Sequence, residues 1–414
     1  MTRIMVAGSG QAGLGAATGL LAAGVDVDVF TTLTTEELLG GPPRLTQMTF
    51  PTVHAAEKKA GLDLWEQISP VFSTIGFTVT SGQEGTEPQS FVGHQRALGT
   101  AVDHRAKTAY WLQEVERRKG RIHVKTVTRE DLFWFAGSGM YDLVIVATGN
   151  SDPHLAPLFP ARPQQRPATV RAVVQAHFEG APPGPDVQVT TTPFGEIFCY
   201  PVLTANGSAT HPEVYPATAV QIYARRGGPL DPATKDIEPG QRPEALYRIW
   251  AFAHQVLATY TPDLAEWCAG ADLVRHSQLL RYVHPVVRRP VVTVGNTPVL
   301  GVGDAVLTVD PTSGQGANAS TLAATTVVNK ITERLAQGGA LADIDFLTSA
   351  YGAYYTSHGR YTSVFNTLVT DFWSGDLAPH MRERFGRNFT DQDQADRMVV
   401  GWDDPSTLGW LLNP

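Results

Sequence analysis

The chain has 414 residues, of which 43% are hydrophobic and 17% are charged. This length is enough for two or three domains, and the apolar content excludes a largely disordered chain. The formal net charge of −8 disfavours nucleic acid as a partner, because an acidic surface repels phosphate backbones.

Two cysteines, Cys199 and Cys268, lie far apart in the sequence, which excludes a disulfide scaffold and a zinc-ribbon site, and we expect no metal. The N-terminus leads directly into an expected strand, without a basic segment followed by a longer apolar one. No window approaches the roughly 18 apolar residues that a membrane-spanning helix needs. We therefore expect a soluble cytoplasmic protein without a membrane partner.

The first 31 residues predict a strand, a glycine-rich turn, a helix and a second strand. Residues 3–7 are β-prone, residues 12–23 are rich in alanine and leucine, and residues 25–30 alternate with a period of two. The turn has the GxGxxG spacing that holds the pyrophosphate of a dinucleotide at a helix N-terminus, and it consists of Gly8, Ser9, Gly10, Gln11, Ala12 and Gly13. The second strand ends at Thr31, where such sites usually carry an acidic residue for the ribose.

Further along, hydrophobic patterning predicts a loop over 41–51, helices over 54–67 and 100–119, a buried strand over 141–149, strands over 170–178, 187–192 and 219–224, and a helix over 243–260. Five prolines between residues 151 and 167 indicate the exit from a first domain. The strands that follow are separated by proline and glycine turns, which favours an antiparallel sheet. The last 75 residues are expected to be helical.

A second strand–turn–helix unit lies near residue 300. A buried strand over 297–304 delivers Asp304 at its end, and a proline- and glycine-rich loop then opens a long helix over 316–336. The carboxylate of Asp304 can bind a ribityl hydroxyl, and the free N–H groups of the helix can stabilise negative charge on a reduced isoalloxazine. One such unit near each end of the chain resembles the glutathione-reductase-like flavoproteins.

A more specific resemblance follows from the loop itself. Residues 308–318 (TVDPTSGQGAN) resemble, nearly letter for letter, the flavin loop of the oxygenase component of two-component styrene/indole monooxygenases. Thr31, residues 101–105 (AVDHR) and residues 141–149 (YDLVIVATG) also match that family, so the similarity covers essentially the whole chain.

The resemblance implies an α/β fold with a glutathione-reductase-like, Rossmann-type FAD domain, an inserted antiparallel-sheet substrate domain and a helical C-terminal region. The expected boundaries are 1–167 and 286–340 for the FAD domain, 168–285 for the substrate domain and 341–414 for the helical region. It also implies that a separate NAD(P)H:flavin reductase supplies reduced FAD. Reaction with O₂ then gives a C4a-peroxyflavin, which oxygenates a small aromatic alkene or indole.

This chemistry belongs to the cofactor, so no side-chain acid or base is assigned. The resemblance implies cofactor contacts from Gly8, Ser9, Gly10, Gln11, Ala12, Gly13, Thr31, Arg44, Arg105, Thr148, Gly149, Gly303, Asp304, Pro311, Gly314, Gly316, Ala317 and Asn318. In particular, Arg105 is expected near the FAD phosphates and Arg44 on the loop over the flavin, while Pro311, Thr312 and Gly314 position the reactive flavin. Substrate contacts are expected from Leu45, Thr46, Gln47, Thr49, Thr312 and Ser313.

The loop after Leu45 departs from the family. It carries Gln47, Thr49 and Pro51, a combination that matches neither the styrene nor the indole subgroup. A buried polar group left unpaired costs about 1–3 kcal/mol, so this polar loop suggests a substrate with a hydrogen-bonding group. His54, His94 and His284 are candidates to line the cavity, but a structural role is the simpler interpretation of each.

Three alternatives remain. A single-component NAD(P)H hydroxylase is disfavoured because the chain has no Asp-Gly dipeptide, and a flavin halogenase because it has no Trp-x-Trp pair. A non-catalytic FAD-binding protein would keep the same fold. The aromatic residues between 351 and 373 are interpreted as helical core, and a homodimer surface there is left open.

Overall fold

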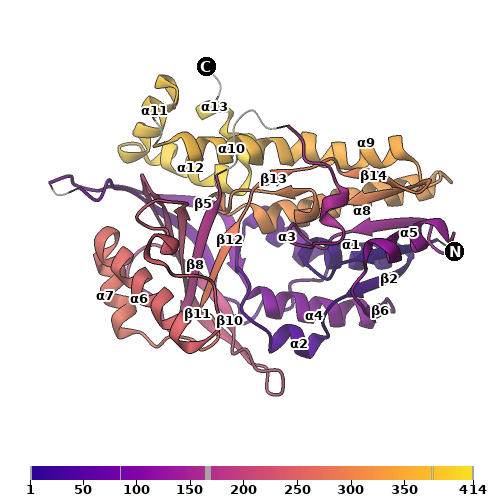
Figure 1. Cartoon of the computed structure of the whole chain (residues 1–414). Coiled ribbons are helices and arrows are strands. Elements are labelled where there is room, and N and C mark those ends of the chain that lie inside the picture. Colours follow the sequence, from indigo (N-terminus) through magenta and orange to yellow (C-terminus); the bar gives the residue numbers. More distant parts are fainter. Residues whose placement is uncertain (1, 84, 164–168, 374, 376, 413–414) are drawn as a thin grey trace.

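The computed structural model describes residues 2–83, 85–163, 169–373, 375 and 377–412. It contains two large sheets with helices packed around them (Figure 1). The first sheet has the strand order β14 (Val291–Val294), β15 (Thr297–Gly301), β7 (Leu143–Val146), β1 (Arg3–Ala7), β2 (Asp26–Thr31) and β6 (Arg121–Val124). Neighbouring strands are parallel except for the hairpin of β14 and β15.

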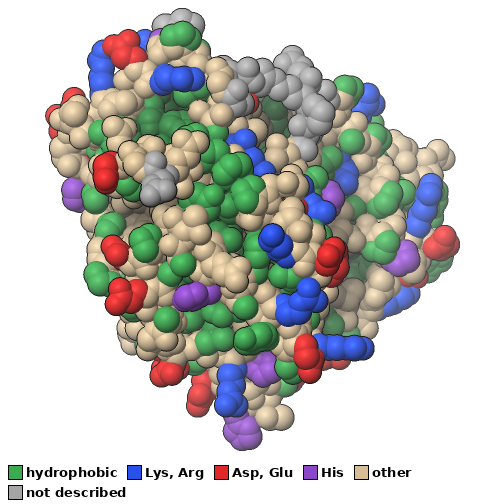
Figure 2. Space-filling view, turned by 60° about the vertical axis from the view of Figure 1, so that its left-hand side comes forward, with side chains coloured by type: hydrophobic (Ala, Val, Ile, Leu, Met, Phe, Trp, Pro, Cys, Tyr) green, Lys and Arg blue, Asp and Glu red, His purple; other side chains and the backbone are tan. Residues whose placement is uncertain are grey.

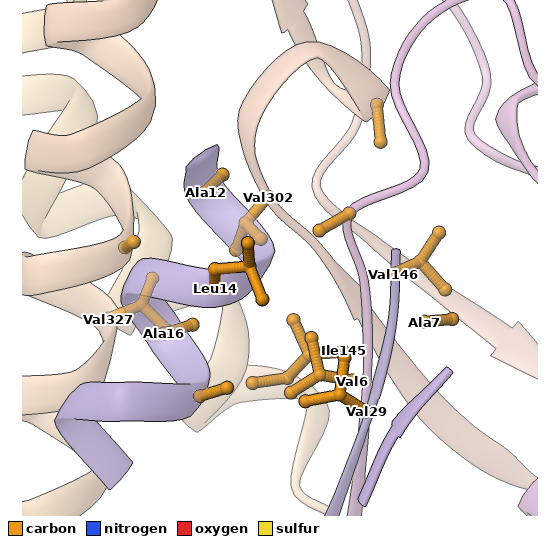
Figure 3. Packing of buried hydrophobic residues seen from close by; sticks show 14 of the residues in the cluster. Val6, Ala7, Ala12, Leu14, Ala16, Val29, Ile145, Val146, Val302 and Val327 are labelled. Atoms are coloured by element: carbon orange, nitrogen blue, oxygen red, sulfur yellow. The ribbon is translucent and has the colours of Figure 1, made fainter. Parts of the chain in front are cut away.

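Helices pack against this sheet. On one face α1 (Gln11–Ala22) packs against α4 (His104–Arg117) and α8 (Gly316–Ala336), and α5 (Arg129–Gly137) packs against β7, β14 and β15. Figure 3 shows the core between α1 and the sheet, where Leu14 and Ala16 face Val6, Val29 and Ile145. These side chains are fully buried, so the glycine turn between β1 and α1 is attached to a rigid core.

The second sheet has the order β12 (Leu279–Val283), β8 (Arg171–Phe178), β11 (Val214–Arg225), β10 (Gly195–Ala205), β9 (Val187–Thr192), β4 (Val71–Val79), β5 (Gln89–Ala101) and β3 (Met48–Thr49). It is antiparallel except for β4 and β9, which are parallel. One face packs on α6 (Pro243–Tyr260) and α7 (Pro262–Gly270), and the other includes core contacts to α10 (Arg360–Asp371) and α12 (Gln392–Asp403).

The remaining elements connect these layers. They are α2 (Thr35–Leu39), α3 (Pro51–Lys59), α9 (Ile344–Tyr354), α11 (Pro379–Gly386), α13 (Gly409–Leu412), and the small pair β13 (Val286–Val287) and β16 (Leu307–Thr308). A π-helical turn, Tyr355–Gly359, joins α9 to α10. On the face shown in Figure 2, acidic and basic side chains are interspersed, and hydrophobic side chains gather in a hollow in the upper part of the view.

The structure confirms an α/β fold with a largely parallel first sheet, and it places the helix expected over 316–336 within those bounds. It differs in the first 120 residues. The helix predicted over 54–67 spans Pro51–Lys59, and the one predicted over 100–119 begins at His104, because Gln89–Ala101 is a strand. The inward positions of β5 include Gly93 and Gln95, so its alternation is not visible as a hydrophobic pattern.

Strands β3 to β5 therefore join the second sheet although they lie within the segment 1–167. The expected boundary between 167 and 168 lies outside the described residues. Among the helices of the described ranges, none combines the length and apolarity that crossing a membrane requires.

Candidate functional site

A cleft of about 860 Å³ lies at the carboxyl ends of β1, β2 and β7, beside the starts of α1, α4 and α8 and beside β12. Ligands of open parallel sheets bind at this edge. The predicted residues that line the cleft are Gly8, Ser9, Gly10, Gln11, Ala12, Arg44, Leu45, Gln47, Thr148, Gly149, Asp304, Pro311, Gly316 and Ala317. The two strand–turn–helix units, about 300 residues apart in the sequence, thus meet at one site.

The glycines of the first turn have different structural roles. Gly8 has φ +114°, and a Cβ there would lie 2.3 Å from the carbonyl oxygen of Ala147. A Cβ on Gly13 would lie 2.1 Å from the carbonyl oxygen of Gly8, so Gly13 serves the packing of helix on strand and does not line the cleft. At Gly10 the nearest atom would be 3.9 Å away, which leaves room for a ligand to approach the backbone. Helix α1 starts with neither a side-chain cap nor an acidic residue, as an anion-binding helix end requires.

Thr31 does not line the cleft, contrary to the prediction. Its hydroxyl oxygen lies 2.7 Å from that of Ser9, and it donates to the carbonyl oxygen of Leu33 at 2.9 Å. Thr31 therefore holds the glycine turn against the end of β2. The neighbouring Thr32 is the residue that is exposed to the cleft.

The second unit presents Asp304 to the cleft. Its carboxylate is partly exposed there but otherwise enclosed by protein, and this burial raises its pKa to about 6. Gly303 adopts φ +60°, and a Cβ there would lie 2.6 Å from Cβ of Ala12, so Gly303 packs on α1 without lining the cleft. At the start of α8, the Ala317 N–H donates to Oε1 of Gln47 at 2.5 Å.

The loop over 310–318 is shaped by its own side chains. Thr312 and Ser313 are fully buried and do not line the cleft, so the structure does not support direct substrate contacts from them. The Asn318 amide accepts from the N–H of Phe50 and donates to the carbonyl oxygens of Met48 and Gly314, each at 3.0 Å. Pro311 reaches the cleft, whereas Gly314, with φ +65°, and Asn318 form the turn behind it.

Arg105 does not lie where the resemblance places it. Its side chain is fully buried, donates to Oδ2 of Asp103 at 2.7 Å and to the carbonyl oxygen of Ala205 at 3.2 Å, and does not reach the cleft. A guanidinium that is enclosed in this way fixes the start of α4 against β10. It is not available to a phosphate.

Charged side chains of both signs line the cleft. Four lysine or arginine side chains, Arg44, Lys107, Lys125 and Arg281, lie there with two carboxylates, Asp152 and Asp304, and Lys107 and Lys125 are paired with Glu57 and Asp131. Within the described ranges, the guanidinium groups of Arg44 and Arg281 form no ion pair, and burial together with the charge of Arg281 lowers the pKa of Arg44. Burial and the nearby cations lower the pKa of His104 to about 3, so this imidazole is neutral.

These features fit the FAD expected from the sequence. The open backbone at Gly10 suits a pyrophosphate, and Arg44 and Arg281 suit its charge. The buried hydroxyl of Thr148, which borders the cleft, has no hydrogen-bond partner in the protein. A group of this kind favours a polar ligand, because an unpaired buried hydroxyl is costly.

On the substrate side, Leu45 and Gln47 line the cleft, whereas Thr46 and Thr49 do not. The Thr46 backbone is fixed to the second sheet: its N–H donates to Oε1 of Gln175 at 2.9 Å, and its carbonyl oxygen accepts from Tyr200 at 3.0 Å and from Gln221 at 2.8 Å. The Thr49 hydroxyl accepts from Nζ of Lys107 at 3.2 Å. Both threonines therefore hold the loop in place.

Of the three candidate histidines, one lines the cleft and two do not. His54 pairs with Asp63 and His94 with Asp396, each at 2.9 Å, and neither lines the cleft. His284 does line it.

Several residues that line the cleft were not predicted from the sequence. His104 and Lys107 lie one turn apart on α4, and residues 125–127 follow β6 at the same sheet edge as the glycine turn, so the second group could have been found from the expected parallel order. Arg281 comes from the edge strand of the second sheet, and no local pattern indicates it.

No protein-family model matches the chain. Two curated relatives, the styrene monooxygenase StyA of Pseudomonas sp and that of Pseudomonas fluorescens, are each 29% identical to it over 333 residues, which cover 78% of this chain and 75% of the relative.

Among solved structures, the flavin-dependent brominase Bmp2 superposes with a TM-score of 0.66 at 12% identity and covers 98% of this chain and 97% of its own. The myxobacterial chondrochloren halogenase CndH gives 0.64 at 15% identity, with 99% and 97% covered. The 2,6-dihydroxypyridine-3-hydroxylase from Arthrobacter nicotinovorans gives 0.62 at 18% identity, with 90% and 93% covered. These likenesses establish the fold, and in sequence the chain is similar to both StyA proteins.

Proposed function

We propose that the chain is the oxygenase component of a two-component flavin monooxygenase, which takes reduced FAD from a separate NAD(P)H:flavin reductase and oxygenates a small aromatic alkene or indole-type substrate. The observation that carries the proposal is the meeting of the glycine turn, Asp304 and the start of α8 at one cleft. The sequence similarity to styrene monooxygenases supports the same reaction class. The finer fold we propose is a glutathione-reductase-like FAD domain with an inserted substrate domain.

When bound, reduced FAD supplies the reaction with O₂ that makes an oxygen atom electrophilic. The protein binds and orients the flavin and the substrate, and it excludes water from the reacting face. The free N–H groups of α1 would hold the pyrophosphate, Asp304 a ribityl hydroxyl, and the N-terminus of α8 the negative charge of the reduced ring. Pro311 and Leu45, both facing the cleft, would keep the reacting face dry.

Dependence on a separate reductase is supported by the sequence. The chain has one GxGxxG turn and no Asp-Gly dipeptide, the motif expected of single-component hydroxylases that bind NAD(P)H themselves. The missing Trp-x-Trp pair likewise counts against a halogenase, although two halogenases share the fold.

The substrate wall supports a substrate that carries a hydrogen-bonding group. Behind Leu45 and Gln47, the side chains of Gln175, Gln221 and Tyr200 form a buried polar network around Thr46. Gln47 is the polar side chain of this loop that lines the cleft. A donor or acceptor on the substrate would pair with its amide, which hydrocarbon alone cannot do.

The test is to combine the purified chain with a flavin reductase, NADH, FAD and O₂ and to analyse products from styrene, indole and polar aryl amines. The proposal predicts oxygenated product only when the reductase is present. Product formation at the same rate without reductase would instead establish a single-component hydroxylase. A clear preference for plain styrene would refute the polar-substrate part.

A further inference from the structure

Three buried ionisable side chains lie behind the loop that opens α8. Arg171 begins β8, Glu196 lies near the start of β10, and Asp310 directly precedes the loop. Their exposed fractions are 0%, 2% and 5%. Nε of Arg171 donates to Oδ2 of Asp310 at 2.9 Å, and its Nη1 donates to Oε2 of Glu196 at 3.4 Å. One cation of the second sheet thus faces two carboxylates.

Asp310 carries this contact into the loop. Its Oδ1 accepts from the backbone N–H of Thr312 at 3.1 Å and from the Thr312 hydroxyl at 2.8 Å, while its carbonyl oxygen accepts from the Ser313 hydroxyl at 3.1 Å. The turn Pro311–Ser313 is therefore folded around one carboxylate, whose other oxygen is held by the second sheet. Pro311 in this turn lines the cleft.

The charge of this cluster depends on whether Glu196 is ionised. Glu196 faces Arg171 on β8, Asp310 before the loop and Arg225 on β11, and Arg225 in turn faces Asp371 on α10. Burial raises the pKa of Glu196 to about 7. Nη2 of Arg171 and Oε1 of Glu196 have no hydrogen-bond partner in the protein. A neutral Glu196 leaves the guanidinium to Asp310, whereas an ionised one competes for it.

We propose that Arg171 is a positioning residue that fixes the loop Pro311–Gly314 against the second sheet, and that the protonation of Glu196 sets how firmly it does so. The inference rests on the proposed function for its catalytic consequence: the loop would be best placed at the flavin when Glu196 is neutral. Below neutral pH more reduced FAD would then lead to oxygenated substrate, and above it more would be lost as H₂O₂.

Loop order can be measured without any activity. Hydrogen–deuterium exchange of the amides of residues 312–314 reports directly on the turn, because each amide is bonded within it. Arg171→Lys keeps the positive charge but loses the guanidinium that donates to Asp310 and Glu196 at once. We expect about tenfold faster exchange of the amides of residues 312–314, because the turn is locally weakened. Glu196→Gln should keep exchange slow at pH 8, after correction for the intrinsic rate, where the wild-type turn loosens.

Glu114→Gln is the matched control, because Glu114 is also buried and paired with arginines, on the part of α4 away from the cleft. This variant should follow the wild type at every pH. Wild-type exchange in Arg171→Lys would overturn the positioning role, and an unchanged pH dependence in Glu196→Gln would overturn the role of its proton. A merely structural Glu196 would change stability without removing that dependence.

The catalytic consequence is read from the ratio of oxygenated product to H₂O₂ when reduced FAD is supplied. We expect about a tenfold lower ratio in Arg171→Lys, since displacements near 1 Å cost up to 10²-fold, and a ratio independent of pH between 6 and 8 in Glu196→Gln. If the wild type neither binds nor uses FAD, the proposed function fails, while the exchange data still decide whether Arg171 positions the loop.

Discussion

The buried ion pair beneath the cleft yields a prediction whose size follows from its geometry. Lys107 and Glu57 are each 4% exposed, and Nζ of Lys107 lies 2.7 Å from Oε1 of Glu57. Glu57 also accepts from Gln11 at 3.2 Å and from Thr321 at 3.4 Å. The network joins α1, α3, α4 and α8, the elements that surround the cleft.

Lys107→Met would leave the Glu57 carboxylate buried without its cation. Breaking a buried pair in this way costs about 3–5 kcal/mol. Because Gln11 and Thr321 keep donating to the carboxylate, we expect a value near the lower end, about 3 kcal/mol, or roughly 10²-fold in the unfolding equilibrium. In the double variant Lys107→Met/Glu57→Gln no buried charge is left unpaired. We therefore expect it to be about 2 kcal/mol more stable than Lys107→Met alone, because the two substitutions are coupled.

Urea denaturation followed by circular dichroism measures these differences. The control is Lys58→Met on α3, because Lys58 pairs with Glu66 on the surface, where an ion pair is screened by water, and little change is expected. A loss below about 1 kcal/mol in Lys107→Met, or a double variant no more stable than the single one, would refute the reasoning.

Three further predictions concern the cleft itself. Gly10→Ala should weaken FAD binding with little loss of stability, whereas Gly8→Ala should lower the melting temperature because its Cβ meets backbone; fluorescence titration and thermal unfolding separate the two. Arg44→Ala should weaken FAD binding while leaving stability nearly unchanged, and Arg105→Ala should mainly destabilise; equal losses of affinity in folded protein would contradict the assigned roles. Asp304→Asn should stabilise the protein more at pH 8 than at pH 4. Burial raises the pKa of this carboxyl to about 6, so its ionisation above that pH opposes folding of the wild type. A difference in urea midpoint that does not change with pH would contradict this expectation.

Local patterns predicted the parts of the fold that depend on short-range rules. The βαβ unit and the helix at Gly316 follow from periodicity and glycine placement, and both units meet at the cleft as expected. The cleft also includes Asp304 and Pro311, two residues whose positions in the motif point to the cofactor.

The positions of the other site residues depend on packing between segments far apart in the sequence. Whether an arginine at the start of a helix meets a ligand or a carboxylate depends on what lies opposite, and Arg105 meets Asp103 and β10. The wall contributed by Arg281 depends on an edge strand from a different sheet. Thr312 and Ser313 occupy a turn whose side chains point into the protein because Asp310 binds them.

The central claim is that this cleft binds reduced FAD and protects its reaction with O₂. The most direct test mixes the purified protein anaerobically with chemically reduced FAD and then with oxygenated buffer in a stopped-flow spectrometer. We predict a long-lived absorbance distinct from both reduced and oxidised FAD, and a faster decay of this absorbance when an aromatic substrate is present. Reoxidation as fast as that of free flavin, with H₂O₂ as the product and no effect of substrate, would contradict the account.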